Sequence, residues 1–210
     1  MSSEAHLGGT SDRDPLKNVP AECYDVFRHP RRIRVLEILG THRTRLSLAE
    51  LTTAIIERET GGVSTGKARH EIRTSLVHNH LPRLADAGLL EFDADTGAEL
   101  VDESPVHPAD LSGLLDLCAG PDGQALLEAI VHPVRIRIVS MLSAATNPVS
   151  VDQFAAKLAA SSVDSLTDAE RAKLKLHHAH LPRLADAGIL EFDADSGLVV
   201  ADEQAMSIAP

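Results

Sequence analysis

The stretch HLPRLADAGLLEFDADTG, residues His80 to Gly97, decides how this chain is organised. It returns one hundred positions later as HLPRLADAGILEFDADSG, His180 to Gly197, with 16 of 18 positions identical. Self-similarity at a fixed offset indicates that one structural unit is used twice. The chain of 210 residues is therefore expected to hold two copies of one domain.

The repeated stretch predicts the end of a helix followed by a hairpin. Leu81 and Leu84 recur at helical spacing, and Gly88 follows where a left-handed residue ends a helix. Residues 89–93 then form a predicted strand, and 98–101 form its partner after an Asp-Thr-Gly turn. The second copy has the same order, so both copies are predicted to end in a two-stranded hairpin.

Upstream signals also occur in pairs. HPRRIRVLEIL (29–39) matches HPVRIRIVSML (132–142), with proline suited to the first helical position and histidine before it at the chain's entry into the helix. Capping boxes follow at 47–50 and 150–153, each eighteen residues after its His-Pro pair, and a third is predicted at Thr167–Glu170. These signals predict a helix from each His-Pro pair and another from each capping box.

Shorter elements complete the expected unit. Residues 21–28 form a predicted short helix with Tyr24 and Phe27 inward, and 44–46 a predicted short strand. Long helices are expected over 68–87 and 169–187, and each contains a proline, Pro82 or Pro182. Because proline removes a backbone bond and clashes with the carbonyl four residues back, we expect a kink near His78 or two helices meeting there.

These boundaries predict five segments. They are a disordered tail (1–20), a first domain (21–104), a partly helical linker (105–119) with a helix over 110–118, a second domain (120–202), and a tail (203–210).

The pattern His-Pro-x-Arg-x-Arg, a capped helix, and His-Leu-x-x-Leu-x-x-Ala-Gly-Leu before a hairpin resembles the winged-helix regulators of the arsenic-repressor type. It is more closely similar to a haloarchaeal winged-helix domain of unknown function, found singly and in tandem. The resemblance covers about residues 21–102 and 124–201. It implies a mainly α fold with small β-hairpin wings (α+β), arranged as two tandem winged helix-turn-helix domains.

In that pattern, the residues around His-Leu enter the DNA major groove. Asn and Arg can contact base edges in pairs of hydrogen bonds, and other basic residues can meet phosphate. The alternative is an ordinary solvated helix face. The candidate DNA-binding residues are Arg69, Arg73, Ser75, His78, Asn79, Arg83, Arg171, Lys173, Lys175, His178 and Arg183.

Composition gives one argument against DNA binding and one reason to give that argument little weight. The net charge of −11 is unusual for a DNA-binding protein. However, arginine outnumbers lysine among the basic residues, which with the acidity resembles a salt-adapted proteome whose acidity says little about partners. The 2% aromatic content argues against a single-strand nucleic-acid platform, which needs aromatic faces for stacking.

Other motifs have simpler explanations. Residues 61–67 fit a phosphate-binding loop but lack the strand before it and the Ser or Thr after it, so we interpret them as a connector. The acidic hairpins are interpreted as turn chemistry, and Cys23 and Cys118 as buried thiols. Among the histidines near His180, only His177 is expected to share a helix face with it, and no metal site is predicted.

No nucleophile paired with a base is recognisable, so an enzyme is not expected, and no cofactor or small-molecule ligand is indicated. No signal peptide or membrane span is expected, which predicts a cytoplasmic location.

The leading hypothesis is a DNA-binding transcriptional regulator in which the two copies act as a covalent pseudo-dimer on double-stranded DNA. The alternative is a protein–protein interaction module without DNA binding, which uses the acidic wings and a leucine-rich linker. A protein partner or homodimer is compatible with both, and a ligand or metal sensor is a third hypothesis.

Overall fold

The computed structural model describes residues 19–20, 23–62, 64–102, 104, 106, 111, 114–115, 123–145, 148–161 and 168–202. These residues are mainly helical, with one antiparallel sheet of two strands and another of three. The predicted tails lie outside this part of the chain except for 19–20, and the predicted linker helix lies outside it except for 111, 114 and 115. No helix among the described residues is long and apolar enough to cross a membrane.

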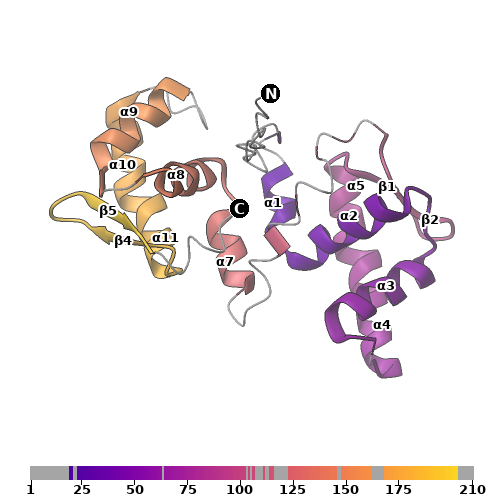
Figure 1. The fold of residues 1–210 in the computed structure, drawn as a ribbon. Coiled ribbons are helices and arrows are strands. Elements are labelled where there is room, and N and C mark those ends of the chain that lie inside the picture. The colour runs from indigo at the N-terminus through magenta and orange to yellow at the C-terminus, as the bar shows by residue number, and fades with distance from the viewer. Residues whose placement is uncertain are drawn as a thin grey trace, which may run out of the picture.

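The two copies present the same elements in the same order. The first copy holds α1 (Tyr24–Phe27), α2 (Pro30–His42), α3 (Leu48–Thr60), α4 (Gly66–Ser75), the π-helix η2 (Leu76–His80), α5 (Leu81–Asp86), β1 (Leu90–Asp93) and β2 (Gly97–Leu100). The second holds α7 (Gly123–Ile130), α8 (Pro133–Ser143), β3 (Val149–Ser150), α9 (Val151–Ser161), α10 (Ala169–Lys175), η5 (Leu176–His180), α11 (Leu181–Asp186), β4 (Leu190–Asp193) and β5 (Leu198–Ala201). The copies lie at opposite ends of the molecule, with α1 and α7 between them (Figure 1).

The His-Pro pairs begin helices as expected. The Nδ1 atoms of His29 and His132 accept the backbone N–H two residues on, each at 3.2 Å, and the following proline is the first helical residue. An imidazole nitrogen therefore satisfies one of the donors that every helix start leaves without a partner.

Two of the three predicted capping boxes are confirmed. The side chains of Ser47 and Glu50 bond each other's backbone N–H at 3.3 and 2.9 Å, and those of Ser150 and Gln153 do so at 3.3 and 3.1 Å. The third prediction is wrong, because α10 is capped one residue later by Asp168, whose carboxylate accepts the Arg171 N–H at 2.8 Å.

Both predicted hairpins are present. Strands β1 and β2 pair antiparallel with Leu90 opposite Leu100, and β4 and β5 pair with Leu190 opposite Ala201. The strand predicted at 44–46 is reduced to one bridge, in which Leu46 and Ala98 exchange two backbone hydrogen bonds of 2.9 Å. Its counterpart β3 has two residues and pairs with β5.

At the place of the predicted kink or helix junction near His78, the structure has a π turn inside one continuous helical segment from Gly66 to Asp86. The N–H of Leu81 bonds the carbonyl of Leu76, five residues back, and Leu181 bonds Leu176 in the same way. The wider turn accommodates the proline that follows, which has no N–H to donate and would clash within regular helix.

The core is built from leucine, isoleucine and valine, with few aromatic side chains. Tyr24 and Phe27 of α1 are buried as predicted, and Phe154 of α9 is fully buried in the second copy. Helix α7 was not predicted, yet its residues Leu127 and Ile130 are buried in the same way as those of α1. At the junction of the copies, Arg28 Nε donates to the carbonyl of Val131 at 3.0 Å.

Candidate nucleic-acid interface

The helical segments α4–η2–α5 and α10–η5–α11 position all the candidate residues. Ile72, Leu76 and Leu81 face the core from the first segment. The polar candidate side chains come between and beside these apolar residues in the sequence and lie on the other side of the helix. Those exposed are Arg69, Arg73, His78, Asn79, Arg83, Arg171, His178 and Arg183, and those partly buried are Ser75, Lys173 and Lys175.

Three exposed side chains of the first copy are available to a ligand. Within the described part of the chain, Arg73, His78 and Asn79 make no hydrogen bond or ion pair. Arg69 is exposed as well, but its Nη2 donates to the Thr53 hydroxyl of α3 at 2.6 Å. The outward surface of this helix therefore carries a guanidinium, an imidazole and an amide that can all bond a partner.

Ser75 is placed differently from the expectation. Its hydroxyl lies 2.8 Å from His80 Nε2 and accepts from Arg31 Nη1 at 3.4 Å, so it serves the interior of the domain. A direct base contact would require Ser75 to leave both partners.

The second copy presents a related but different surface. Arg171 and His178 are exposed, and the His178 ring lies 4.7 Å from that of His177. Lys173 is bound to Asp152 of α9 at 2.6 Å, and Lys175 is partly buried. Because Asn79 is replaced by Ala179, this copy lacks the amide that can read adenine in the first.

The histidines that end the π turns are buried against the histidines that cap the preceding helix. The rings of His29 and His80 lie 4.4 Å apart, and those of His132 and His180 lie 4.8 Å apart. The prediction that His177 and His180 share a helix face is wrong. His180 packs against His132, whereas the His177 ring packs against Phe192, with ring centroids 5.4 Å apart. The π turn changes the angle between residues three apart, so the α-helical spacing rule does not hold there.

Burial sets the protonation of His80, which is 1% exposed. Burial, together with the positive charges of His29, Arg31, Arg32 and Arg83, lowers its pKa to about 3, and burial is the largest cause. His80 is therefore neutral near pH 7, which fits a ring that hydrogen-bonds Ser75.

The acidic hairpins are explained by turn chemistry, as predicted. Asp93 accepts the N–H groups of Asp95 and Thr96 at 3.0 and 2.8 Å, and these bonds, led by the one from the Thr96 N–H, lower the pKa of its carboxyl group. Asp193 holds the second turn in the same way, with a 2.5 Å bond from the Ser196 hydroxyl. In the first copy Arg45 also pairs with Glu91 and Glu99.

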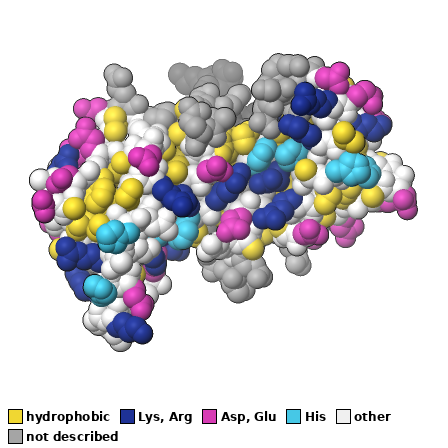
Figure 2. Space-filling view, turned by 180° about the vertical axis from the view of Figure 1, so that it is seen from behind, with side chains coloured by type: hydrophobic (Ala, Val, Ile, Leu, Met, Phe, Trp, Pro, Cys, Tyr) yellow, Lys and Arg dark blue, Asp and Glu magenta, His cyan; other side chains and the backbone are white. Residues whose placement is uncertain are grey.

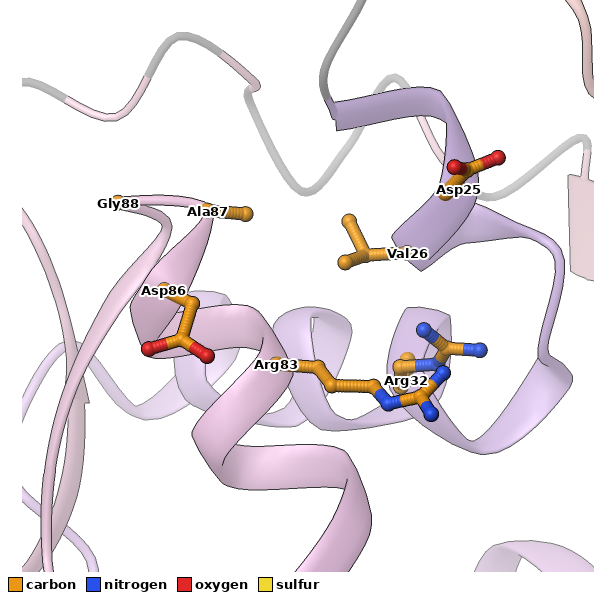
Figure 3. A pocket seen from close by; sticks show the side chains of 7 residues that line it. All are labelled: Asp25, Val26, Arg32, Arg83, Asp86, Ala87 and Gly88. Atoms are coloured by element: carbon orange, nitrogen blue, oxygen red, sulfur yellow. The ribbon is translucent and has the colours of Figure 1, made fainter.

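Arg83 and Arg183 lie apart from the outward row of side chains. Arg83 projects beside Arg32 of α2, in the wall of a cavity of about 540 Å³ near α1 (Figure 3). Arg183 lies near Arg135 of α8. The pKa of Arg135 falls to about 10, mainly because Arg135 is buried, and the positive charges of Arg28 and then Arg183 contribute to the fall. These two candidates are therefore placed near the junction of the copies.

A basic group at this junction was not predicted from the sequence. Figure 2 shows Lys and Arg side chains gathered across the middle of one face. The His-Pro-x-Arg motif contained the signal, because Arg32 and Arg135 occupy the same position in it. The histidine and proline of the motif are explained by the start of a helix. Spacing and residue type alone therefore indicate no further role for the arginine.

Two further motifs of the sequence have structural roles. Gly61 ends α3 in the left-handed conformation and Thr65 caps α4, so residues 61–67 act as the predicted connector, with Val63 outside the described residues. Cys23 is buried and not in a disulfide, and Cys118 lies outside the described residues. No group of three or more His, Cys, Asp or Glu residues suited to a metal ion occurs in the described part of the chain.

Comparison with known proteins finds one protein family. Its model, described as a domain of unknown function, matches the chain twice, over residues 24–99 and 127–200. The first match runs from α1 to β2, and the second from α7 to β5, so each covers one copy. No curated protein and no solved structure matches the chain.

Proposed function

Because the chain belongs to the DUF7344 family, whose description is a domain of unknown function, we propose its activity from its own geometry. It binds double-stranded DNA through two tandem winged helix-turn-helix domains and regulates transcription. The two domains act as a covalent counterpart of a twofold dimer.

The order of elements supports the winged-helix assignment. In each copy α2 or α8 is followed by a short strand or bridge, a capped helix, a long helix and an antiparallel hairpin. In this assignment α3 and α9 precede the reading helices, and the hairpins are the wings. The segment between α9 and α10 is longer than the usual helix-turn-helix connection.

The observation that carries the proposal is the outward surface of the long helix in both copies. Arg73, His78 and Asn79 are exposed in the first copy, and Arg171 and His178 are exposed in the second. A helix of this size fits the major groove, where Arg and Asn distinguish base pairs by paired hydrogen bonds. Two such surfaces on one chain match two half-sites about one helical turn apart, roughly 34–36 Å.

The acidic wings limit which parts of the domains can contact DNA. Glu91 is largely exposed, and Asp95 is exposed beside it in the same hairpin. Carboxylates would repel phosphate, so the wings stay away from the DNA backbone and the helices carry the contacts. Affinity then depends on base contacts more than on counterion release, which weakens as salt rises.

We expect the double variant Arg73→Ala, Arg171→Ala to lose DNA affinity by at least about tenfold per arginine, because each loses a charge-assisted contact. Fluorescence anisotropy on duplexes selected by the wild-type chain measures the change. The slope of log affinity against log salt should fall by about one for each arginine that meets phosphate.

The matched control is Arg58→Ala, Lys157→Ala, which removes the same charge from α3 and α9. Arg58 is bound to Glu37 at 2.7 Å, so it is already neutralised within the fold. Equal losses in the two double variants would mean that net charge, not the reading helices, governs binding, and the site assignment would then be wrong.

Protein interaction remains the second candidate because the second copy exposes apolar side chains. Leu174 of α10 is 62% exposed, and Leu198 and Val200 of β5 are each 42% exposed. The first copy has Thr74 at the place of Leu174, and Gly97, opposite Asp93, at the place that Leu198 takes opposite Asp193. If light scattering shows a concentration-dependent dimer that Leu198→Ser, Val200→Thr abolishes, this surface is a protein interface.

A further inference from the structure

The cavity between α1, α2 and α5 contains a buried cation without a full set of partners. Its lining residues are Asp25, Val26, Arg32, Arg83, Asp86, Ala87 and Gly88. Arg32 is only 7% exposed, and its Nε atom is buried without a hydrogen-bond partner among the described residues. A buried charged donor left in this state is costly, so such a group in a native fold requires an explanation.

The charges near Arg32 do not neutralise it. The guanidinium of Arg83 lies beside that of Arg32, and this like charge adds to burial in lowering the pKa of Arg32 (Figure 3). Asp25 is the acidic residue that acts in the opposite direction, but its carboxylate is bound to Arg28 at 2.8 Å and is largely exposed. Within the described part of the chain, neither guanidinium forms an ion pair with Asp25 or Asp86, so the two guanidiniums form a positive wall of the cavity.

The second copy places protein groups beside the equivalent arginine, although the Nε atom of Arg135 is also buried without a hydrogen-bond partner among the described residues. Arg135 corresponds to Arg32, and its Nη2 donates to the carbonyl of Glu128 at 3.2 Å. Arg28 of the first copy reaches across to the Val131 carbonyl and lies near Arg135. No such crossing side chain reaches the first copy from the residues that the structure describes, and this copy keeps an open cavity of about 540 Å³.

We propose that this cavity binds the phosphate group of a small molecule between the guanidiniums of Arg32 and Arg83. Guanidinium groups present planar forks of N–H donors that match phosphate oxygens, and two of them balance a phosphate dianion. The cavity volume is within the range of small-molecule sites, so it also has room for the group that carries the phosphate.

The opposite side of the cavity sets a second requirement. Asp86 extends from α5 on the side away from the two guanidiniums (Figure 3). Its carboxylate repels a second anionic group and accepts hydrogen bonds from hydroxyl or amino groups. The chemistry therefore favours a phosphate monoester with a hydroxylated or amino-bearing body.

Isothermal titration calorimetry of the full chain with inorganic phosphate, and separately with glycerol phosphate, tests the site. Sodium chloride at equal ionic strength is the reference. We expect saturable binding of phosphate, tighter binding of the ester, and a phosphate-dependent rise in Tm that chloride does not reproduce.

Two variants locate the site. Arg32→Met and Arg83→Gln should each raise the Kd for phosphate at least about tenfold, because each removes one fork of the pair. Arg32→Met should fold normally, because replacing a buried charge without a partner by an apolar chain is commonly neutral or stabilising. Arg83 is exposed, so Arg83→Gln tests the site even if the first variant fails to fold. Arg58→Gln is the control, because Arg58 pairs with Glu37 and does not line the cavity.

Phosphate binding at this cavity does not require that the chain binds DNA, so the two are tested separately. Equal effects of phosphate and chloride, or unchanged phosphate affinity in both variants, would overturn the proposal. It would also be overturned if free phosphate did not bind while Arg32→Met weakened DNA binding, because the pair would then serve the DNA backbone.

Discussion

Replacing Gly97 by alanine is expected to destabilise the first domain by more than about 3 kcal/mol, a loss in the range of the most damaging single substitutions. Gly97 has a φ of +100°, which an L side chain rarely adopts. A Cβ atom at this position would lie 2.0 Å from the backbone oxygen of Leu46 and 2.8 Å from its carbonyl carbon. The clash is with backbone, so the bridge between Leu46 and Ala98 would have to break.

The repeat supplies the control in Gly197, which has the same position in the repeated sequence but lies in the turn before β5, because Leu198 is the residue opposite Asp193. Its φ is +65°, and an added Cβ would meet only a side-chain atom of Val151 at 3.9 Å. Gly197→Ala should therefore lower the free energy of unfolding by only about 1–2 kcal/mol, which is the cost of placing alanine in the left-handed conformation. Urea unfolding of both variants, followed by circular dichroism, gives the comparison. Equal losses at the two positions would show that the close approach at Leu46 is absent in solution.

Lowering the pH from 7 to 5 is expected to remove about 2 kcal/mol of stability through His80 alone. In the folded state burial and the neighbouring positive charges lower the pKa of His80 from 6.5 to about 3, so the folded protein does not protonate it in this range. The unfolded chain does take up the proton below pH 6.5, so acid favours unfolding. The contribution is complete above pH 6.5 and is lost as the pH falls towards 3.

His80→Asn isolates this effect, because asparagine can still bond Ser75 but does not titrate. The free energy of unfolding of wild type and variant, measured by urea at pH 5 to 7, should converge as the pH falls. His70→Asn, at an exposed position of α4, should keep the wild-type slope. The same slope in His80→Asn as in wild type would mean that His80 is not buried as a neutral ring. His29 should add a smaller loss in the same direction, because burial lowers its pKa as well.

Local signals in the sequence predicted local structure well. The caps at His29 and Ser47 and the turn at Asp93 depend on residues two or three positions apart, so their hydrogen bonds can be read from spacing and residue type. The repeat alone indicated two units, and both matches to the family follow it. Where two local signals competed, as at Thr167 and Asp168, spacing alone selected the wrong cap.

What spacing could not predict depends on contacts between distant residues. The π turn before Pro82 changes which side chains share a face, so His80 pairs with His29 instead of following α-helical periodicity. Arg32 and Arg83 lie beside each other although their helices are about fifty positions apart in the chain. The sequence predicts Arg83 as a DNA contact because spacing gives its position in the helix but not its neighbour.

Selection of the full chain on a random pool of duplex DNA, followed by sequencing, tests the central claim most directly. We expect an enriched motif of two unlike halves separated by about one helical turn, because Asn79 and Ala179 differ. The variant His78→Ala, Asn79→Ala should lose sequence preference in one half and keep it in the other. A wild-type chain that enriches no motif would contradict the claim that these helices read DNA.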